Sequence, residues 1–468
     1  MLKTKIKSLI SITLSVTLLF SILSIDAFAN SDAALEESLN TQLKNFNDTV
    51  DIYNFKIPYT DENIQKISNI LYGVLPECFH IEDFSISHTN EYISKIYPSY
   101  SCTKAEYDLM LAECEAAADK MLEGVEGNAN LSDKEKLLII HDRIAISCEY
   151  DYESYLMGNT PQNSYTIYGV LVKNRAVCQG YALAYSYLLD RIGIENYYCS
   201  SDALNHVWNI VYLDGKPYHV DITYDDPVWD VTGKVLHTNF LVSTDELRQN
   251  KHNADDFDSS PSDTTYDDYF WQNIESAFVY LNGEIYYTEL EDGEYVTIKR
   301  YSDKQTLYKT KHYWRVGQYG YYPGDYSKLA VCGSKILFSL SDGIYSLNPN
   351  TKEVKMILSN PQASNYYNIY GFTYANGQLI YDVTPTPNFD ANTKKNYEYK
   401  VEYHDPGNLN DDGNIDLLDV TLLAEFLADW QGVKVNSKTL DISGDGVTNL
   451  FDLVRLSQYV AGWNVEIY

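Results

Sequence analysis

The sequence predicts an α+β region, an all-β region and a small all-α region, in that order along the chain. Three observations lead to this prediction. A helix-period apolar run precedes a strand hairpin over residues 178–223, similar strand pairs recur between residues 277 and 401, and two acidic loops each precede a helix after residue 405. Since the chain has 468 residues and 45% hydrophobic content, we expect several packed domains rather than disorder.

The first 29 residues have the pattern of an export signal. Three lysines lie among the first seven residues, an apolar core follows, and Ala27-Phe28-Ala29 provides a small-x-small cleavage site. A membrane anchor is the alternative, but the apolar core is short and is interrupted by serines. We expect a secreted, extracellular protein that begins near Asn30, without a later membrane span.

The charge of the chain is strongly negative. The formal net charge is −31, and removal of residues 1–29, which carry three lysines and one aspartate, leaves −33. Because such a surface repels phosphate backbones and anionic lipids, nucleic acid is not an expected partner. The 44 tyrosines could stack on sugar rings, but tyrosine also favours strands, so contact with polysaccharide stays an open alternative.

Residues 30–126 predict an N-terminal flanking α/β region. We expect helices over residues 35–43, 61–75 and 104–122, and a hairpin over residues 84–100, with no chemical constellation of their own. Residues 127–262 then form the expected catalytic region, whose first helix spans residues 133–146. His141 lies on this helix, and we interpret it as a packing residue.

Cys178 begins the central helix of the catalytic region. The apolar run from Ala182 to Leu189 has a 3.6-residue period, and Gly193 ends it. A cysteine at a helix start lies at the positive end of the helix dipole, which favours the thiolate that a nucleophile requires. The alternative is a small buried hydrophobic residue.

His206 and Asp221 lie on a predicted hairpin. With Asp214-Gly215 as a two-residue loop, Trp208 faces Asp221, so His206 and Asp221 are diagonal neighbours on one face of the hairpin. His219 shares this face nearer the turn. We favour His206 as the catalytic base and expect His219 to stay solvated, so that a nucleophile, a base and an orienting carboxylate occur in chain order.

These motifs resemble the transglutaminase-like superfamily of papain-like cysteine enzymes. The resemblance rests on the stretch Tyr168–Ala182, on His206-Val-Trp-Asn and on His219-Val-Asp221-Ile-Thr, and it covers about residues 127–252. It implies an α+β papain-like core in which Cys178 is the nucleophile, His206 the base and Asp221 the residue that orients the base. It also implies a protein or peptide substrate whose amide bond reacts through a thioester, with no cofactor for catalysis.

The seven cysteines are an odd number with scattered spacing. They contain no paired spacing of a zinc site, and they do not resemble the framework of a small disulfide-rich domain. We therefore expect mostly reduced thiols.

Residues 268–403 predict a separate β-rich domain. The preceding residues 253–268 are rich in Asp, Ser, Thr and Pro and indicate a linker or a long loop. The three similar strand pairs have turn glycines at Gly283, Gly333 and Gly377, which are 50 and 44 residues apart. This spacing suits propeller-type blades, but three blades would not close a usual propeller, so a β-sandwich or a partial array stays open. The region could bind substrate or act as a spacer.

Two 12-residue loops near the C-terminal end have the EF-hand pattern of calcium ligands. Each loop offers oxygen ligands at positions 1, 3, 5, 7, 9 and 12, with glycine at position 6. Solvated acidic loops are the alternative, but two copies 33 residues apart favour calcium sites. The expected ligands of the two Ca²⁺ ions are Asn408, Asn410, Asp412, the Asn414 carbonyl, Asp416 and Asp419, and Asp441, Ser443, Asp445, the Val447 carbonyl, Asn449 and Asp452.

The loop-helix repeats of residues 405–468 resemble a type I dockerin, the module that docks enzymes onto cohesin domains of a cellulosome scaffold. The expected helices are Leu417–Trp430 and Leu450–Trp463, with no helix leading into either loop. The resemblance implies a cohesin partner and contacts from loop positions 10 and 11. These positions hold the apolar pairs Leu417 with Leu418 and Leu450 with Phe451.

Three functional interpretations compete. The first is a secreted, scaffold-anchored cysteine enzyme acting on amide bonds, with hydrolysis favoured over crosslinking. The second is a transglutaminase-like fold that only binds, and the third gives the main role to the β-rich region, in contact with polysaccharide. Because all three residues of the expected triad are present, we favour the first.

Overall fold

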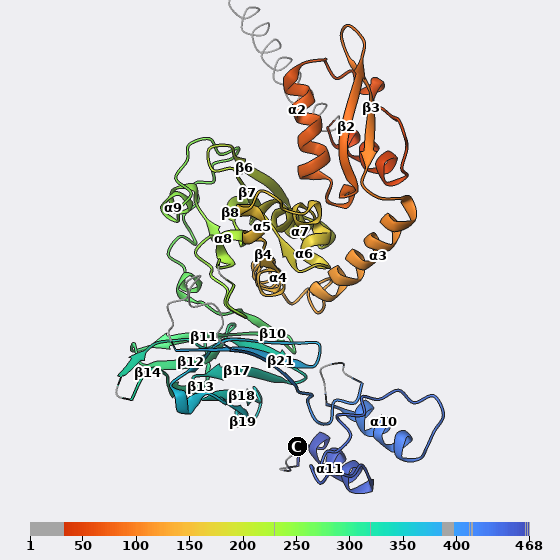
Figure 1. Cartoon of the computed structure of the whole chain (residues 1–468). Coiled ribbons are helices and arrows are strands. Elements are labelled where there is room, and N and C mark those ends of the chain that lie inside the picture. Colours follow the sequence, from red (N-terminus) through yellow and green to blue (C-terminus); the bar gives the residue numbers. More distant parts are fainter. Residues whose placement is uncertain are drawn as a thin grey trace, which may run out of the picture.

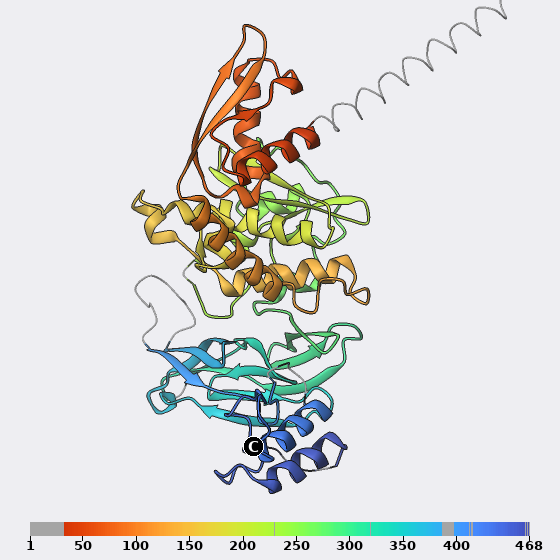
Figure 2. The same cartoon turned by 90° about the vertical axis from the view of Figure 1, so that its right-hand side faces the viewer.

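The computed structural model describes residues 32–228, 230–318, 320–385, 397–410, 412, 415–463, 465 and 467. The expected export signal, residues 1–29, and Asn414 of the first acidic loop lie outside these ranges. Figure 2 shows the described regions following one another in chain order, from the N-terminal region to the C-terminal pair of helices. Within these ranges, no helix has both the length and the apolar character needed to cross a membrane.

The N-terminal region is a small α/β unit with a core of its own. Its antiparallel sheet has the order β1-β3-β2 and packs Val50 and Ile96 against Leu39 of the first helix. The helix expected over residues 61–75 is α-helical only in its first part and then continues as a π-helical turn. The elements are a helix over residues 32–44, β1 (Val50–Asp51), η1 (Tyr53–Phe55), α2 (Asp61–Asn69), the π-helical η2 (Ile70–Val74), η3 (Pro76–Cys78), β2 (Ile81–His88), β3 (Ile93–Tyr100) and α3 (Lys104–Met121).

The next region packs helices against an antiparallel sheet of order β6-β7-β8-β9 (Figure 1). The central helix α7 lies on β7, where the Asn209 side chain donates hydrogen bonds to the Ala182 carbonyl and to Ser186. The Asp214-Gly215 turn gives the predicted hairpin register, with Leu213 opposite Lys216. The elements are α4 (Asp133–Ser147), β4 (Glu149–Tyr150), α5 (Tyr152–Leu156), η4 (Gln162–Tyr165), α6 (Ile167–Leu171), β5 (Arg175–Ala176), α7 (Cys178–Arg191), β6 (Asn196–Ser201), β7 (His206–Leu213), β8 (Lys216–Val220), α8 (Ile222–Asp225), β9 (Phe240–Val242) and α9 (Thr244–Gln249).

The acidic segment of residues 253–268 is a long loop fastened to this sheet rather than a free linker. Asp256 accepts a hydrogen bond from the Ser201 hydroxyl at 2.6 Å, and Asp263 accepts one from the Tyr218 hydroxyl at 2.6 Å. Of the two expected forms, a linker or a long loop, the structure shows the long loop, and its carboxylates accept hydrogen bonds from donors along the sheet.

The middle region is all-β, as predicted, and consists of antiparallel meanders. All three predicted strand pairs form hairpins, β10–β11, β16–β17 and β20–β21. In two of their turns, Asn282-Gly283 and Asn376-Gly377, both residues have positive φ, the geometry that favours Asn-Gly. The elements are η5 (Phe270–Asn273), β10 (Val279–Leu281), β11 (Glu284–Glu291), β12 (Tyr295–Arg300), β13 (Thr306–Lys311), β14 (Tyr313–Val316), β15 (Gly320–Pro323), β16 (Leu329–Cys332), β17 (Lys335–Leu340), β18 (Gly343–Leu347), β19 (Val354–Ser359), η6 (Ala363–Asn365), β20 (Asn368–Ala375), β21 (Gln378–Thr384) and β22 (Tyr397–Glu402).

Strands β16–β18 are buried on both faces of their sheet. Phe338 and Leu340 belong to the core shared with β10–β12, whereas Leu337 and Ile344 pack into the core shared with β20–β22. This alternation stacks the meanders in layers, as successive propeller blades do, whereas a two-sheet sandwich buries one face of each sheet.

The β-rich region shares one continuous core with residues 127–262, the expected catalytic region. The Phe240 and Trp271 rings lie 5.3 Å apart between centroids, and Phe270 and Phe278 lie 5.3 Å from Tyr287. The hydrophobic core therefore continues across residue 268, where the sequence predicts a domain boundary.

The C-terminal region contains α10 (Leu417–Leu427) and α11 (Leu450–Val460), which pack around Leu423 and Leu456. Both helices end three residues before the predicted tryptophans. Asp429 and Gly462 adopt left-handed φ values of 55° and 77°, which ends each helix there.

Candidate active site and docking module

Cys178 is the first residue of α7. Val177 is extended and caps the helix without a side-chain hydrogen bond, so the N–H groups of the first turn have no capping side chain. Cys178 is half-buried. Two residues on, a Cβ at Gly180 would lie 2.7 Å from the Ser164 carbonyl oxygen, so glycine is required for this helix start to pack on η4. The thiol therefore lies at a helix dipole's positive end.

The structure brings His206 and Asp221 together as the hairpin register predicted. His206 Nε2 lies 2.7 Å from Asp221 Oδ2, and both side chains are buried. Since Nε2 faces the carboxylate, the other ring nitrogen, Nδ1, is left to face Cys178. Burial alone would lower the pKa of His206, but the charge of Asp221 and hydrogen bonds with Asp221 and Cys178 raise it to about 10.

Tyrosines surround Cys178. Burial raises the pKa of Tyr150, Tyr198 and Tyr224, and the charge of Cys178 adds to each rise. Their hydroxyl groups therefore stay protonated and can donate hydrogen bonds to negative charge. The His206 ring lies between Tyr224 and Trp208, at centroid distances of 4.9 and 5.5 Å, which restricts its orientation.

His252 is a second histidine on the same carboxylate, and the sequence analysis missed it. Its Nε2 lies 2.7 Å from Asp221 Oδ2, while its Nδ1 donates to the Asn250 carbonyl at 3.1 Å. Asp221 Oδ1 accepts the Tyr224 N–H and thereby caps α8. Burial alone would raise the pKa of Asp221, but His206 and His252 lower it, so the carboxylate stays ionised.

The expectation that His219 is solvated is wrong. His219 is buried, accepts a hydrogen bond from Trp208 Nε1 at 2.8 Å and bonds to Thr244 Oγ1 at 2.9 Å. Burial and the positive charge of His252 lower the pKa of His219 to about 3. His219 therefore supports the Trp208 ring and leaves His206 as the histidine beside the thiol.

All seven cysteines are free thiols, as expected. Burial raises the pKa of Cys78, Cys114, Cys199 and Cys332 to about 12, which leaves these thiols protonated and unreactive at neutral pH. Most of the other thiols therefore differ from Cys178 in burial and setting.

The first acidic loop of the C-terminal region fits a cation. Asn408 is 5% exposed, and its Oδ1 has no hydrogen-bond partner among the described residues. Asp419 at position 12 is fully buried and accepts N–H groups of Leu409 and Asp416. Burial raises the pKa of Asp419, backbone hydrogen bonds oppose this, and the charges of Asp412 and Asp416 add to the rise. An oxygen without a donor beside crowded carboxylates is the environment that Ca²⁺ completes.

The second loop repeats the arrangement at position 12 but differs at position 1, where the side chain has donors. Asp441 accepts N–H groups from Gly444, Asp445 and Gly446, and Asp452 accepts those of Ser443 and Asn449. The remaining predicted ligand residue, Val447, is exposed at the loop surface. The backbone is thus already folded around the positions of the predicted ligands.

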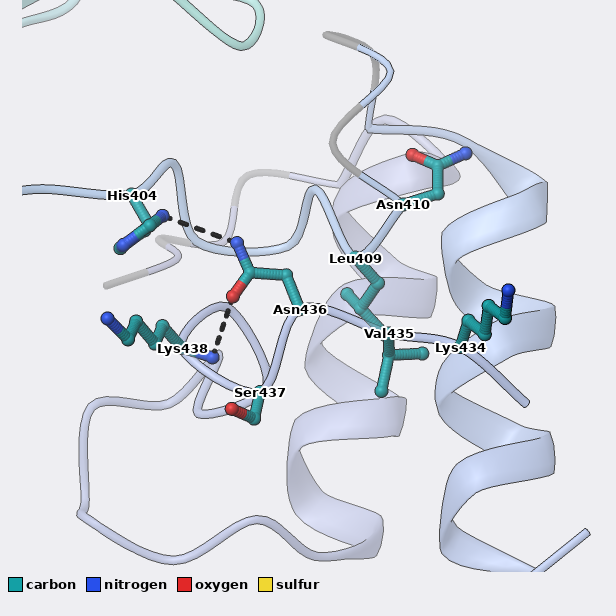
Figure 3. A pocket seen from close by; sticks show the side chains of 8 residues that line it. All are labelled: His404, Leu409, Asn410, Lys434, Val435, Asn436, Ser437 and Lys438. Atoms are coloured by element: carbon teal, nitrogen blue, oxygen red, sulfur yellow. Dashed lines mark hydrogen bonds between the residues drawn. The ribbon is translucent and has the colours of Figure 1, made fainter. Parts of the chain in front are cut away.

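The predicted docking residues are exposed on the two helix starts. Leu417, Leu418, Leu450 and Phe451 have exposed fractions of 72%, 51%, 69% and 60%. A separate open pocket of about 490 Å³ lies where the β-rich region meets this module (Figure 3). His404 and Asn436 bond across it at 3.2 Å, and neither Cys178 nor His206 lines it.

The two loop-helix repeats define a small calcium-binding docking module. Residues 406–461 match the family described as "Dockerin type I domain", so the chain carries such a domain there. Dockerin domains of this type bind calcium and dock onto cohesins of cellulosome-type assemblies.

Solved structures resemble this chain only loosely. A crystal structure of a TGase is 15% identical at a TM-score of 0.22, with 36% of this chain and 49% of that chain covered. This chain thus spans about half the length of the TGase. The arylamine N-acetyltransferase NAT3 from Bacillus cereus, with a Cys-His-Glu catalytic triad, is 13% identical at a TM-score of 0.19, with coverages of 54% and 95%. We draw no conclusion from such loose likenesses, and no curated protein matches the chain.

Proposed function

We propose that this chain is a secreted, scaffold-anchored cysteine enzyme with a papain-like, transglutaminase-like core that acts on amide bonds of proteins or peptides. Cys178 is the nucleophile, His206 the base and Asp221 the residue that orients the base. The observation that carries the proposal is the buried 2.7 Å contact of His206 with Asp221, next to a half-exposed thiol at the start of a helix. Such a constellation supports acyl transfer through a thioester.

The chemistry assigns one task to each residue. The Cys178 thiol gives its proton to His206, the sulfur attacks the carbonyl carbon and forms a C–S bond, and the C–N bond breaks as the amine leaves with that proton from the His206 imidazolium. Water then attacks the thioester and gives a proton to His206, the C–S bond breaks and the acid leaves, and the proton on His206 returns to the Cys178 sulfur. A lysine amine in place of water would give a new amide bond instead, and we favour water.

Two measurements test this proposal. Iodoacetamide should label Cys178 faster than the other six thiols, as peptide mass spectrometry can show, whereas uniform labelling would contradict the assigned nucleophile. Incubation with a casein mixture and a dansylated amine then separates the two outcomes of the thioester. New peptide termini indicate hydrolysis, and fluorescent high-mass products indicate transfer. A selectively labelled Cys178 without either product would favour a binding role for the fold.

The docking module would place this enzyme on a cohesin. The proposed contact uses the apolar pairs at loop positions 10 and 11 of each repeat, so it is hydrophobic rather than a Ser/Thr hydrogen-bonded contact. Because both repeats present such a pair, the module offers two orientations.

A further inference from the structure

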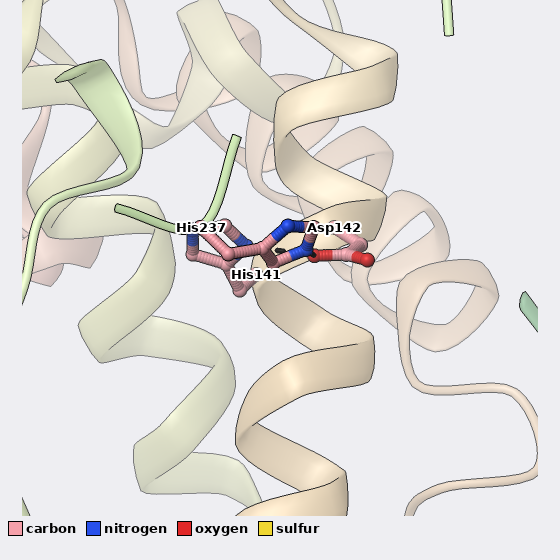
Figure 4. A group of neighbouring side chains, drawn as sticks. All are labelled: His141, Asp142 and His237. Atoms are coloured by element: carbon pink, nitrogen blue, oxygen red, sulfur yellow. Dashed lines mark hydrogen bonds and ion pairs between the residues drawn. The ribbon is translucent and has the colours of Figure 1, made fainter. Parts of the chain in front are cut away.

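A second buried histidine–aspartate cluster lies outside the proposed triad (Figure 4). Asp142 Oδ1 lies 2.8 Å from His141 Nδ1 and 3.0 Å from His237 Nε2, and His141 Nε2 lies 3.2 Å from Asp225 Oδ2. All four side chains are buried. Burial alone would lower the pKa of His141, but its bonds to Asp142 and Asp225 raise it to about 9.

The β-rich region supplies further hydrogen bonds to this cluster. The Phe278 N–H donates to Asp142 Oδ2 at 2.6 Å, and His237 Nδ1 donates to the Ile274 carbonyl at 3.0 Å. Each ring nitrogen of His141 and His237 thus faces an oxygen. The cluster is a buried hydrogen-bond network that joins α4 to the segment entering β10.

The β-rich region also forms hydrogen bonds with the loop that leads from α8 to His237. The Phe372 N–H donates to the Thr232 carbonyl at 2.7 Å, and the Thr232 hydroxyl donates to Asp382 at 2.8 Å. At Gly233, which has a φ of 74°, a Cβ would lie 1.9 Å from the Phe372 carbonyl oxygen. Strands β20 and β21 therefore fix the backbone of this loop at a point where only glycine fits.

Asp225 links the cluster to the proposed active site. It ends the four-residue helix α8, whose N-cap is Asp221, and its carboxylate also accepts the Asn239 N–H at 3.0 Å. The Asn239 carbonyl in turn accepts a hydrogen bond from the Asp221 N–H at 3.0 Å. The backbone on both sides of Asp221 is therefore held by groups that depend on this cluster.

We propose that the β-rich region is a positioning part of the catalytic unit, because its contacts at Ile274, Phe278 and Phe372 hold Asp221 against His206 through the cluster of His141, Asp142, Asp225 and His237. These four are positioning residues, since none of them contacts Cys178. The inference rests on the proposed triad and gives the β-rich region a role other than that of a spacer or a polysaccharide-binding domain.

The test compares two glycine variants in the full chain. Gly233→Ala places a methyl group against the Phe372 carbonyl, whereas Gly293→Ala has a similar φ of 70° with nothing within 4 Å, so it controls for backbone strain. Iodoacetamide alkylation of Cys178 is measured across pH. We expect Gly233→Ala to lower the rate at neutral pH by roughly 10- to 100-fold and to shift the pH profile, while Gly293→Ala keeps the wild-type profile. A folded Gly233→Ala protein with the wild-type profile would overturn the proposal.

Two further measurements keep the test decisive if Gly233→Ala does not fold. Asp142→Asn keeps the side-chain shape but removes the negative charge and replaces one of the two acceptor oxygens with an NH2 donor, so it should cause the same shift. In the wild-type chain with rising urea, exchange of the Phe278 and Phe372 amides should coincide with loss of the pH-dependent reactivity. Reactivity that outlasts the opening of these amides contradicts the inference.

A readout independent of the thiol separates this inference from the proposed function. The His206 ring, which faces Asp221, Cys178, Tyr224, Trp208 and His252, can be titrated by NMR. If Cys178 proves unreactive, the proposed function fails, yet a lower His206 pKa in Gly233→Ala alone still supports positioning. A His206 titration that is unchanged in Gly233→Ala as well as in the control Gly293→Ala refutes the positioning role. A stoichiometric metal ion bound in the cluster also refutes it.

Discussion

Buried carboxylates are held by side chains in the proposed catalytic region and mainly by backbone in the docking module. Asp221 receives two histidine rings at 2.7 Å each, and Asp142 receives rings at 2.8 and 3.0 Å. Asp419 and Asp452 instead accept backbone N–H groups, and Asn408 Oδ1 beside them lacks a donor among the described residues.

This difference indicates two routes to a stable acidic site. In the catalytic region the compensating charges are part of the chain, so the site is complete once the chain has folded. In the docking module the neutralising charge has to come from a bound ion, and binding free energy then becomes folding free energy. The two regions should therefore respond differently to substitution, chelation and pH.

The largest expected effect is that of Asp221→Asn. An amide can hydrogen-bond to His206 but cannot stabilise its imidazolium form, so activity should fall by roughly 10³- to 10⁴-fold with the fold retained. Steady-state rates with circular dichroism as the fold control would measure this. Unchanged turnover would show that another acid orients the base.

Chelation of Ca²⁺ should affect the docking module. Excess EGTA should unfold the docking module and weaken cohesin binding by roughly 1,000-fold or more, because without Ca²⁺ its carboxylates repel one another. Calorimetry with a cohesin gives the affinity, and the rate of Cys178 alkylation serves as the internal control. A parallel loss of alkylation would show that the two regions do not stabilise their acids independently.

The stability of the catalytic region should fall as the pH rises. The folded-state pKa of His206 is raised to about 10, so its contribution is complete below its unfolded pKa of about 6.5 and is lost as the pH passes through 10. Melting temperatures of the wild type and His206→Gln should therefore differ most at neutral or lower pH and converge near pH 10. A constant difference across this range would mean that His206 does not gain a proton on folding.

The smallest expected effect concerns the docking helices. Replacing Leu417 and Leu418 with Asp should change cohesin affinity by no more than about twofold, because Leu450 and Phe451 offer the same contact in the second orientation. Replacing both pairs should abolish binding. A single-pair variant that loses all binding would rule out the dual orientation.

The sequence predicted the parts of the site that depend on local patterns. The helix start at Cys178 and the register of the hairpin that pairs His206 with Asp221 follow from periodicity and from an Asp-Gly turn. The two calcium loops could be predicted because each expected ligand set lies within 12 residues, and the family match at residues 406–461 supports calcium binding by this module.

The missed residues are joined only by tertiary structure. His252 lies 31 residues from Asp221, and His237 lies 95 residues from Asp142, so no spacing rule connects them. The available signal was compositional, since five of the nine histidines fall between residues 141 and 252. Similarly, the composition of residues 253–268 fits a linker and a long loop equally well, and only the tertiary structure shows that its carboxylates bond to donors on the sheet.

The junction between the β-rich region and the docking module determines how the enzyme would be carried on a scaffold. The buried Asp405 carboxylate forms an ion pair with Lys335 at 2.6 Å and accepts the Ser334 N–H. The start of the docking module is therefore packed against the turn of the β16–β17 hairpin rather than joined to it by a flexible linker. If the module binds cohesin in either of two orientations, the whole enzyme must turn over with it. A single enzyme could then direct Cys178 toward opposite sides of the scaffold axis, and neighbouring enzymes would meet it in two distinct arrangements.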